Sequence, residues 1–406
     1  MNFFYIEDGD TAKSIAGVNS YHKAFRRIMR KNDEDMYQIT KSKLGADTFF
    51  GVHPTWWGSN YLQNFEGFKN GFYWWEAKRD IAQTDEIVIL PIRTALAHKW
   101  KSSVWYNMWY SMGTGRIDTY YRETWRNVRF GGRTHYLAYE CPNESVVLEL
   151  KPEGLLESIE EMDAVVRTVD PYQTSQPDCR VLLLFGMENA LNWFYNDDPT
   201  PPWFPRHKIL TRVLECADKV FGSFLCDLIP TAEIANGSLY MDGDRPRYGN
   251  QTYDAVVLLA PDSMDRSCFS LLSEIDRERF LVAGGFEVYS DGGKLSRADR
   301  EILQRGVTLS EINCPDAILS VLEGWNIKKN RFENGCVLQD GSLIFTGEGE
   351  KAVKNRLSVD VVHHGVHIRF EGEDMLYLHH TGEGYLPVYP KGKLAMEPDR
   401  RNKAAG

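Results

Sequence analysis

The alternation of strand-like and helix-like segments in the first 170 residues constrains the fold of this chain more than any other feature. Short apolar runs that end at glycine, proline or an acid alternate there with stretches whose apolar residues recur at helical spacing. The expected strands are 2–6, 47–54, 71–86, 102–111 and 133–141, and the expected helices are 20–44, 89–100, 119–130 and 153–168. A strand–helix order repeated about five times predicts a parallel sheet covered by helices.

Four of these strands carry a carboxylate or a histidine at their carboxyl ends, namely Glu7, His53, Asp85 and Glu140. In a (β/α)8 barrel this is the face that holds the active site. A complete barrel has eight strands in typically about 250 residues. We therefore expect an α/β fold that begins with an incomplete (β/α)8 TIM-type barrel, about strands 4 to 8, whose N-terminal half is missing.

The rest of the chain predicts two further domains. The buried runs "RVLLLFG" and "YDAVVLLAPD", separated by amphipathic helices, favour a flavodoxin-like doubly wound domain. Short strands and glycine turns after it, including a hairpin across "HHG", favour a small antiparallel β-domain. The expected boundaries are barrel 1–170, linker 171–179, flavodoxin-like domain 180–325, β-domain 326–390 and disordered tail 391–406.

Composition excludes several classes of function. The net charge is −10 and no Lys/Arg stripe occurs, which argues against a nucleic-acid partner. No apolar run reaches the ~18 residues of a membrane span, and no signal peptide is evident. The seven cysteines are scattered without C-x-x-C spacing, so we expect buried thiols, no metal site and no cofactor. The His pairs of the C-terminal part are expected on a surface hairpin.

Tryptophan is concentrated in the N-terminal third, which holds eight of the 11 tryptophans. Such a density suits stacking against the flat faces of sugar rings, and it equally suits a large aromatic core.

The three-part order resembles that of the family-42-type β-galactosidases and related barrel glycoside hydrolases. Local segments carry the same resemblance: "YHKAFRRIMRKND" is similar to the helix after their fourth barrel strand, and "VLLLFGMENALNWF" and "YDAVVLLAPD…LVAGG" to their second domain. That domain is related to class I glutamine amidotransferases and mediates trimerisation in the family. The resemblance implies a carbohydrate substrate and a homo-oligomer, a trimer or a dimer, formed through this domain.

The resemblance also implies roles for individual residues. It makes 2–6 the fourth barrel strand and places Glu7 where the family has its general acid/base. At the seventh strand, where the family has its nucleophile, Asn107 and Met108 stand instead. Asp85 and Glu140 are then the carboxylates available to act with Glu7, and retaining and inverting mechanisms both stay open because they differ in the separation of the two carboxylates.

Each acid also has a structural interpretation. Glu7 could favour a helix dipole, Asp85 could cap the helix after it, and Glu140 could form a salt bridge. Glu76 and Asp80 flank Arg79, which fits an ion pair as well as sugar contacts.

The motif "GVHPTWWG" is the strongest candidate for sugar binding. A histidine can donate to a hydroxyl group and tryptophans can stack on a ring, although the same residues could pack beneath a loop. The expected substrate-binding residues are His53, Trp56, Trp57, Glu76, Arg79, Asp80, Asn107 and Trp109.

Two functions therefore follow from the sequence. One is a β-galactosidase-like glycoside hydrolase, or its C-terminal part, that uses paired carboxylates. The other is a non-catalytic carbohydrate-binding or degenerate glycosidase-like protein. The compartment stays open between the cytoplasm and, where a signal peptide precedes this chain, the periplasm or the exterior.

Overall fold

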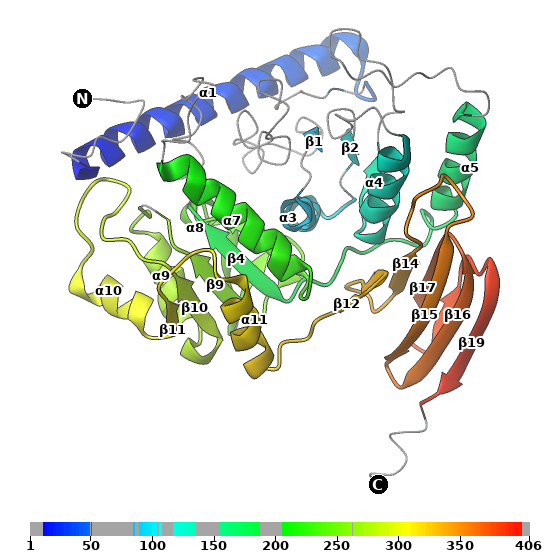
Figure 1. Ribbon diagram of the computed structural model, residues 1–406. Coiled ribbons are helices and arrows are strands. Elements are labelled where there is room, and N and C mark those ends of the chain that lie inside the picture. The colour runs from blue at the N-terminus through cyan, green and yellow to red at the C-terminus, as the bar shows by residue number, and fades with distance from the viewer. Residues whose placement is uncertain are drawn as a thin grey trace. The chain divides into compact units, whose positions relative to one another are not determined.

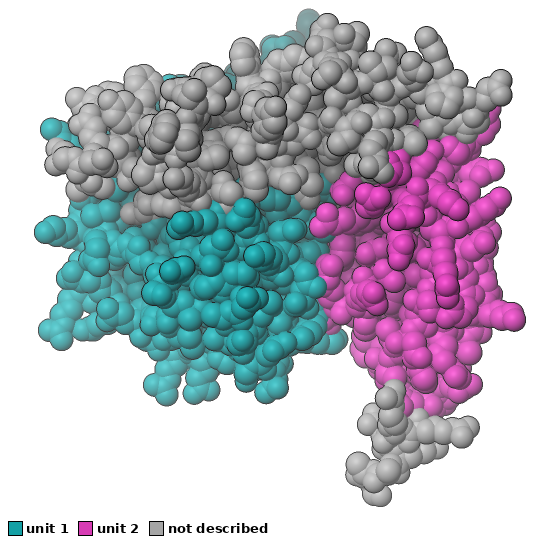
Figure 2. All heavy atoms as spheres, viewed as in Figure 1, with its two compact units in different colours: residues 1–101, 179–329 teal, residues 102–178, 330–406 magenta. Residues whose placement is uncertain are grey.

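The computed structural model describes residues 11–48, 50, 84–85, 89–103, 105–107, 117–134, 155–186, 205–261 and 263–399. The chain divides into two compact units, coloured separately in Figure 2. Unit 1 comprises residues 1–101 and 179–329, and unit 2 comprises residues 102–178 and 330–406. Each unit thus combines two stretches that are far apart in the sequence, and the first 170 residues contribute to both.

Unit 1 is built on a five-stranded sheet in which every neighbouring pair is parallel (Figure 1). Its order is β11-β10-β9-β4-β5. The strands are β4 (Val181–Phe185), β5 (Cys226–Pro230), β9 (Ala255–Leu259), β10 (Phe280–Ala283) and β11 (Val307–Leu309). The central strand β4 pairs Leu183 with Leu228 on one side and with Val257 on the other. Because β4 and β9 are apolar on both faces, they can be covered by helices on both sides, as a parallel sheet requires.

The other elements of unit 1 are mainly helices. They are α1 (Thr11–Leu44), α3 (Leu90–Trp100), α7 (Pro205–Phe221), α8 (Ala232–Ala235), α9 (Cys268–Glu274), η3 (Arg277–Arg279), α10 (Arg297–Gln304) and α11 (Pro315–Gly324). A short strand β1 (Thr84–Asp85) also belongs here, as does an antiparallel sheet of β6 (Leu239–Asp242), β7 (Arg245–Tyr248) and β8 (Gln251–Thr252).

Helix α3 is packed deep in unit 1. All its residues from Leu90 to His98 are buried, and the hydroxyl of Thr94 lies 3.4 Å from the carbonyl oxygen of Cys226 in β5. The helix predicted over 89–100 is confirmed, and it packs on β5 at the edge of the parallel sheet.

Helix α1 confirms the helix predicted over 20–44 and extends it toward the N-terminus. Its N-terminal part packs through Ile15 and Val18 against Val288. The apolar positions farther along, which the spacing marks as a buried face, are exposed: Ile28 is 63% exposed and Ile39 is 55% exposed.

Unit 2 contains two helices, a short parallel pair and two antiparallel sheets. The helices and the parallel pair are α4 (Ile117–Arg129), α5 (Leu155–Arg167), β2 (Trp105–Asn107) and β3 (Arg133–Thr134). One antiparallel sheet has the order β12-β13-β14-β17-β18 and the other β15-β16-β19. Their strands are β12 (Arg331–Phe332), β13 (Gly335–Val337), β14 (Leu343–Thr346), β15 (Arg356–His363), β16 (Val366–Glu373), β17 (Met375–His380), β18 (Tyr385–Pro387) and β19 (Gly392–Pro398).

The two antiparallel sheets share one hydrophobic core. Phe345 and Leu378 from the first sheet and Ile368 and Phe370 from the second belong to a single buried cluster. The predicted hairpin is confirmed, because His364 and Gly365 join β15 to β16 with positive φ angles of 46° and 73°. Two positive φ angles in a two-residue loop define the type I′ turn that suits twisted strands.

The C-terminal segment corrects the expectation of a disordered tail from residue 391. Residues 392–398 form β19, which pairs antiparallel with β16 from Gly372↔Gly392 to Val366↔Pro398. Leu394 and Met396 pack against the core of the two sheets, which explains why this polar-looking segment is held as a strand.

Helix α4 packs on the antiparallel part of unit 2. Trp125 is fully buried, and its indole N–H donates to the carbonyl oxygens of Lys351 and Ala352, each at 3.2 Å. Arg129 donates to the hydroxyl of Thr346 at 3.0 Å. None of the described helices combines the length and apolar character that a membrane crossing needs.

Candidate functional site

The predicted site residues fall almost entirely outside the described residues. Asp85 ends strand β1 and Asn107 ends strand β2. The pairing of β2 with β3 is parallel, and Asn107 is the last residue of β2. The remaining predicted residues lie outside the described ranges: Glu7, His53, Trp56, Trp57, Glu76, Arg79, Asp80, Trp109 and Glu140. Their roles stay predictions.

A cavity in the described part of unit 1 lies over the carboxyl ends of the parallel strands. Its volume is about 830 Å³. Its floor includes Thr231, which follows β5 directly, Asp265, which follows β9, and Asp291, which follows β10. In open α/β sheets, ligands bind in the crevice outside the carboxyl ends of the strands.

Helix α1 forms the opposite wall of this cavity and is fastened beside it by a polar contact. The side-chain amide of Asn19 donates to the hydroxyl of Ser263 at 3.2 Å and to the carbonyl oxygen of Ser290 at 3.1 Å. Ser263 is fully buried. Together with the contact of Ile15 and Val18 on Val288, this fixes the N-terminal half of α1 across the loops that follow β9 and β10.

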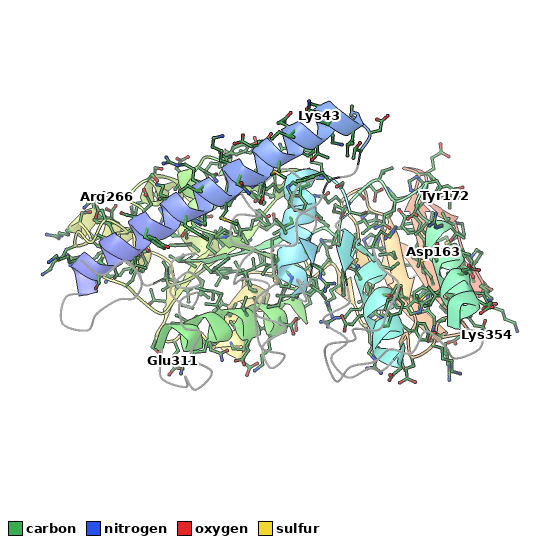
Figure 3. All side chains as sticks on the ribbon, turned by 90° about the horizontal axis from the view of Figure 1, so that it is seen from above. Lys43, Asp163, Tyr172, Arg266, Glu311 and Lys354 are labelled. Carbon is green, nitrogen blue, oxygen red and sulfur yellow. The ribbon has the colours of Figure 1, made fainter. Side chains whose placement is uncertain are left out.

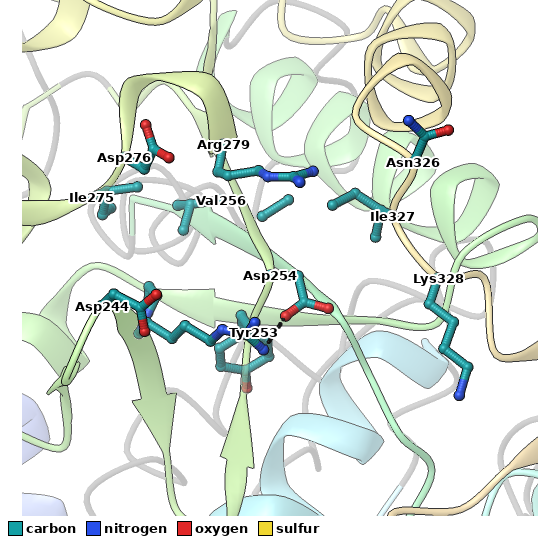
Figure 4. Close-up of a pocket in the computed structure, with 13 residues that line it drawn as sticks. Asp244, Tyr253, Asp254, Val256, Ile275, Asp276, Arg279, Asn326, Ile327 and Lys328 are labelled. Carbon is teal, nitrogen blue, oxygen red and sulfur yellow. Dashed lines mark hydrogen bonds and ion pairs between the residues drawn. The ribbon is translucent and has the colours of Figure 1, made fainter.

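A second cavity of about 410 Å³ lies at the opposite, amino ends of the strands (Figure 4). It is lined by residues that precede β9 and β10, among them Asp254 and Asp276. Arg245 forms an ion pair with Asp254 at 2.6 Å, so these two charges of the cavity lining already neutralise each other. The cavity at the carboxyl ends is therefore the stronger candidate for a ligand site.

A buried polar network lies between α3 and the parallel sheet. His98 Nδ1 is 2.6 Å from Asp227 Oδ2, and the hydroxyl of Tyr253 donates to the same oxygen at 2.7 Å. All three side chains are fully buried. Burial raises the pKa of Tyr253 well above its usual range, and the neighbouring Asp227 adds to the effect.

Cys179 stands beside this network and makes it resemble a metal centre. The potential ligand atoms of His98, Cys179 and Asp227 all lie within 4.8 Å of one another. However, burial, reinforced by Asp227, raises the pKa of the Cys179 thiol well above its usual range. A metal ligand must be a thiolate. Since the histidine is already bonded to the carboxylate, the arrangement fits a structural hydrogen-bond network better than a metal site.

The network continues at the end of α3 through a second buried carboxylate. Glu233 accepts from Lys99 at 3.1 Å and from the hydroxyl of Tyr248 at 2.6 Å. Burial, followed by the charge of Glu233, raises the pKa of Tyr248 well above its usual range. These contacts tie α3 to the antiparallel sheet β6-β7-β8 and help to explain why α3 belongs to unit 1.

The histidine pairs of unit 2 meet at one end of its two sheets. The rings of His363 and His364 stack at 4.0 Å, and His364 lies 5.3 Å from His380. His380 Nδ1 is 3.2 Å from the carbonyl oxygen of Asp340, and His363 Nδ1 bonds the hydroxyl of Tyr385. The spacing along the sequence does not reveal this juxtaposition, because the two pairs come from different strands.

Comparison with known proteins gives a distant structural resemblance. No protein-family model and no curated protein matches the sequence. A catalytic mutant of Gan42B, a GH42 β-galactosidase from G. stearothermophilus, aligns with a TM-score of 0.41 and 10% identity over 85% of this chain and 58% of that one. The β-galactosidase from Rahnella sp. R3 aligns with a TM-score of 0.30 and 11% identity over 69% and 40%. The chain thus spans less than two thirds of the length of either protein.

The basic face of α1 is the feature of the cavity that the sequence analysis missed. Lys23, Arg26, Arg27 and Arg30 line the cavity from this helix. Their spacing is visible in "KAFRRIMR", but charged residues on a helix are usually solvated. The signal would have been that these four cations recur at helical spacing in a stretch of α1 that holds no acid before Asp33.

Proposed function

We propose that this chain is a barrel-type glycoside hydrolase, β-galactosidase-like, or the C-terminal part of one. The observation that carries the proposal is the order of its parts along the chain. Segments with acids at expected strand ends come first, then a five-stranded parallel sheet, then two antiparallel sheets on one core. This is the order that the family-42-type resemblance implies.

The strand order of the parallel sheet supports a flavodoxin-like assignment of the second part. Taken in chain order, its strands are arranged 2-1-3-4-5, with β4 between β5 and β9. That is the order of flavodoxin-type doubly wound sheets. On this proposal the domain has a structural or oligomerising role, and the chain forms a trimer or a dimer through it.

The proposed chemistry needs two carboxylates on either side of a glycosidic bond. Glu7 would protonate the leaving oxygen, and Asp85 or Glu140 would either attack the anomeric carbon or activate a water molecule for the attack. The proton donor must hold its proton at neutral pH, which calls for a raised pKa. Trp56 and Trp57 would stack on the sugar.

The alternative is a carbohydrate-binding protein without hydrolytic activity. The observation in its favour is Asn107 at the carboxyl end of β2, where the resemblance implies the nucleophile. A side-chain amide is neither a competent nucleophile nor a general base at neutral pH, so hydrolysis then depends on another acid.

A panel of chromogenic β- and α-glycosides tests the proposal, with sugar binding measured in parallel by quenching of tryptophan fluorescence. Turnover of a β-glycoside supports the hydrolase. Saturable binding without turnover supports the alternative. Neither turnover nor binding of any sugar in the panel contradicts both.

A further inference from the structure

The cavity over the carboxyl ends of β5, β9 and β10 is more basic than the rest of the molecule. Of its charged lining side chains, five are basic and two are acidic, whereas the whole chain has a net charge of −10. A local reversal of sign inside a concave site raises the concentration of oppositely charged ligands there.

Four of these cations belong to one face of α1. Lys23, Arg26, Arg27 and Arg30 are spaced i, i+3, i+4 and i+7, so they lie side by side over two helical turns. Like charges at these spacings repel one another and destabilise a helix. An anion that binds between these cations reduces their mutual repulsion.

The acids of the cavity do not supply that anion. Asp291 is engaged by Arg266 at 3.0 Å, and this contact lowers the pKa of the Asp291 carboxyl. Asp265 accepts from the backbone N–H and hydroxyl of Ser267, the latter at 2.7 Å. Both carboxylates therefore already have partners in the loops that follow β9 and β10.

The basic side chains of the cavity differ in whether they already pair with a carboxylate. Lys99 bonds the buried carboxylate of Glu233 at 3.1 Å. Lys23, Arg27 and Arg30 are exposed and make no ion pair with any carboxylate among the described residues. Three cations thus face the cavity with their charge available to a ligand.

We propose that this cavity is a binding site for a small molecule that carries two phosphate groups or a pyrophosphate, held by Lys23, Arg27 and Arg30 against the Thr231 side of the cavity. Guanidinium groups bind phosphate oxygens in a bidentate fashion. Residues i and i+7 of a helix are about 10 Å apart along its axis, which suits a ligand with two phosphate groups better than one with a single carboxylate. The volume of about 830 Å³ falls in the range of cofactor and metabolite pockets.

Isothermal titration calorimetry of the full chain with inorganic pyrophosphate tests the proposal. We expect one site per chain, with binding that weakens as salt is raised. The double variant Arg27→Gln and Arg30→Gln should bind at least about 100-fold more weakly, because each lost hydrogen bond to a charged group weakens binding by about tenfold or more. Both side chains are exposed, so far-UV circular dichroism should show an unchanged fold.

The matched control removes two positive charges from the same helix outside the cavity. Lys31 pairs with Asp35 on the solvent side, and Lys43 stands at the far end of α1 from Arg266 (Figure 3). The variant Lys31→Gln with Lys43→Gln should bind pyrophosphate like the wild type. Equal weakening in both double variants would show a diffuse charge effect and overturn the site.

Two further results would overturn it. One is the absence of any heat at millimolar pyrophosphate, and the other is displacement of pyrophosphate by a single-stranded RNA oligomer that binds more tightly. Within a confirmed site, adenosine diphosphate, a sugar bisphosphate and orthophosphate identify the source of the phosphates. The proposal uses no residue of the proposed hydrolysis, so Glu7→Gln should leave pyrophosphate binding unchanged.

Discussion

Replacement of Asp227 by alanine should destabilise unit 1 strongly. One carboxylate oxygen, Oδ2, accepts from His98 at 2.6 Å and from Tyr253 at 2.7 Å, and all three side chains are fully buried. Water cannot replace the lost acceptor, and each buried group left without a partner costs about 1–3 kcal/mol. Two such groups give about 2–6 kcal/mol, which agrees with the cost of breaking a buried pair by removal of one member.

Hydrogen exchange followed by mass spectrometry measures this loss of stability separately in each unit. A loss of about 4 kcal/mol should accelerate exchange of the slowest amides in β4 and β5 about 10³-fold, with little change in β14–β17 of unit 2. The control is Asp242→Ala, whose ion pair with Arg247 at 2.7 Å is partly exposed and should contribute only about 0.2–1 kcal/mol. Equal acceleration by the two variants, or a change spread evenly over both units, would refute the reasoning.

Three further predictions concern packing, backbone and pH. Trp125→Ala should cost about 3–5 kcal/mol and speed exchange in unit 2, because it empties a fully buried site. Gly249→Ala should lower the free energy of unfolding, measured by urea denaturation, far more than Gly243→Ala does. Both glycines have positive φ, but a Cβ at Gly249 would lie 2.0 Å from the carbonyl oxygen of His98 in α3, whereas nothing lies within 4 Å of a Cβ at Gly243. Burial raises the pKa of Tyr377 and of Tyr385 to about 12 from 10.0. The unfolded chain therefore loses these protons first, and stability should fall as pH rises from 10 to 12; circular dichroism should show a shallower fall once both are replaced by phenylalanine.

Helices and buried strands could be predicted from local pattern alone. α5 appears where the sequence spacing predicts it, and β4 and β9 lie within the two strongest apolar runs. β19 was missed because Lys393 and Glu397 make the segment look like a polar tail. The sequence signal for β19 is the alternation that brings Leu394 and Met396 to one face. This alternation indicates a strand only when β16 is known to be available as its pairing partner.

Partners distant in sequence could not be predicted. His98 and Asp227 are separated by 129 positions, and nothing in the sequence around either residue points to the other. The same holds for the cavity: the cations of α1 are evident in the sequence, but their position opposite Thr231 follows from the packing of Ile15 and Val18 on Val288. The strand-end acids stay a prediction from a local pattern, a carboxylate after an apolar run, and their mutual geometry cannot be derived from a local pattern.

The most direct test of the proposed hydrolase is the rate of β-glycoside hydrolysis by three forms of the full chain. These are the wild type, Glu7→Gln and the neighbouring control Asp10→Asn. Loss of general acid catalysis should lower kcat of Glu7→Gln by about 10²–10⁴-fold, while Asp10→Asn retains the wild-type rate. Hydrolysis by Glu7→Gln at the wild-type rate, or no hydrolysis of any β-glycoside by the wild type, would contradict the account.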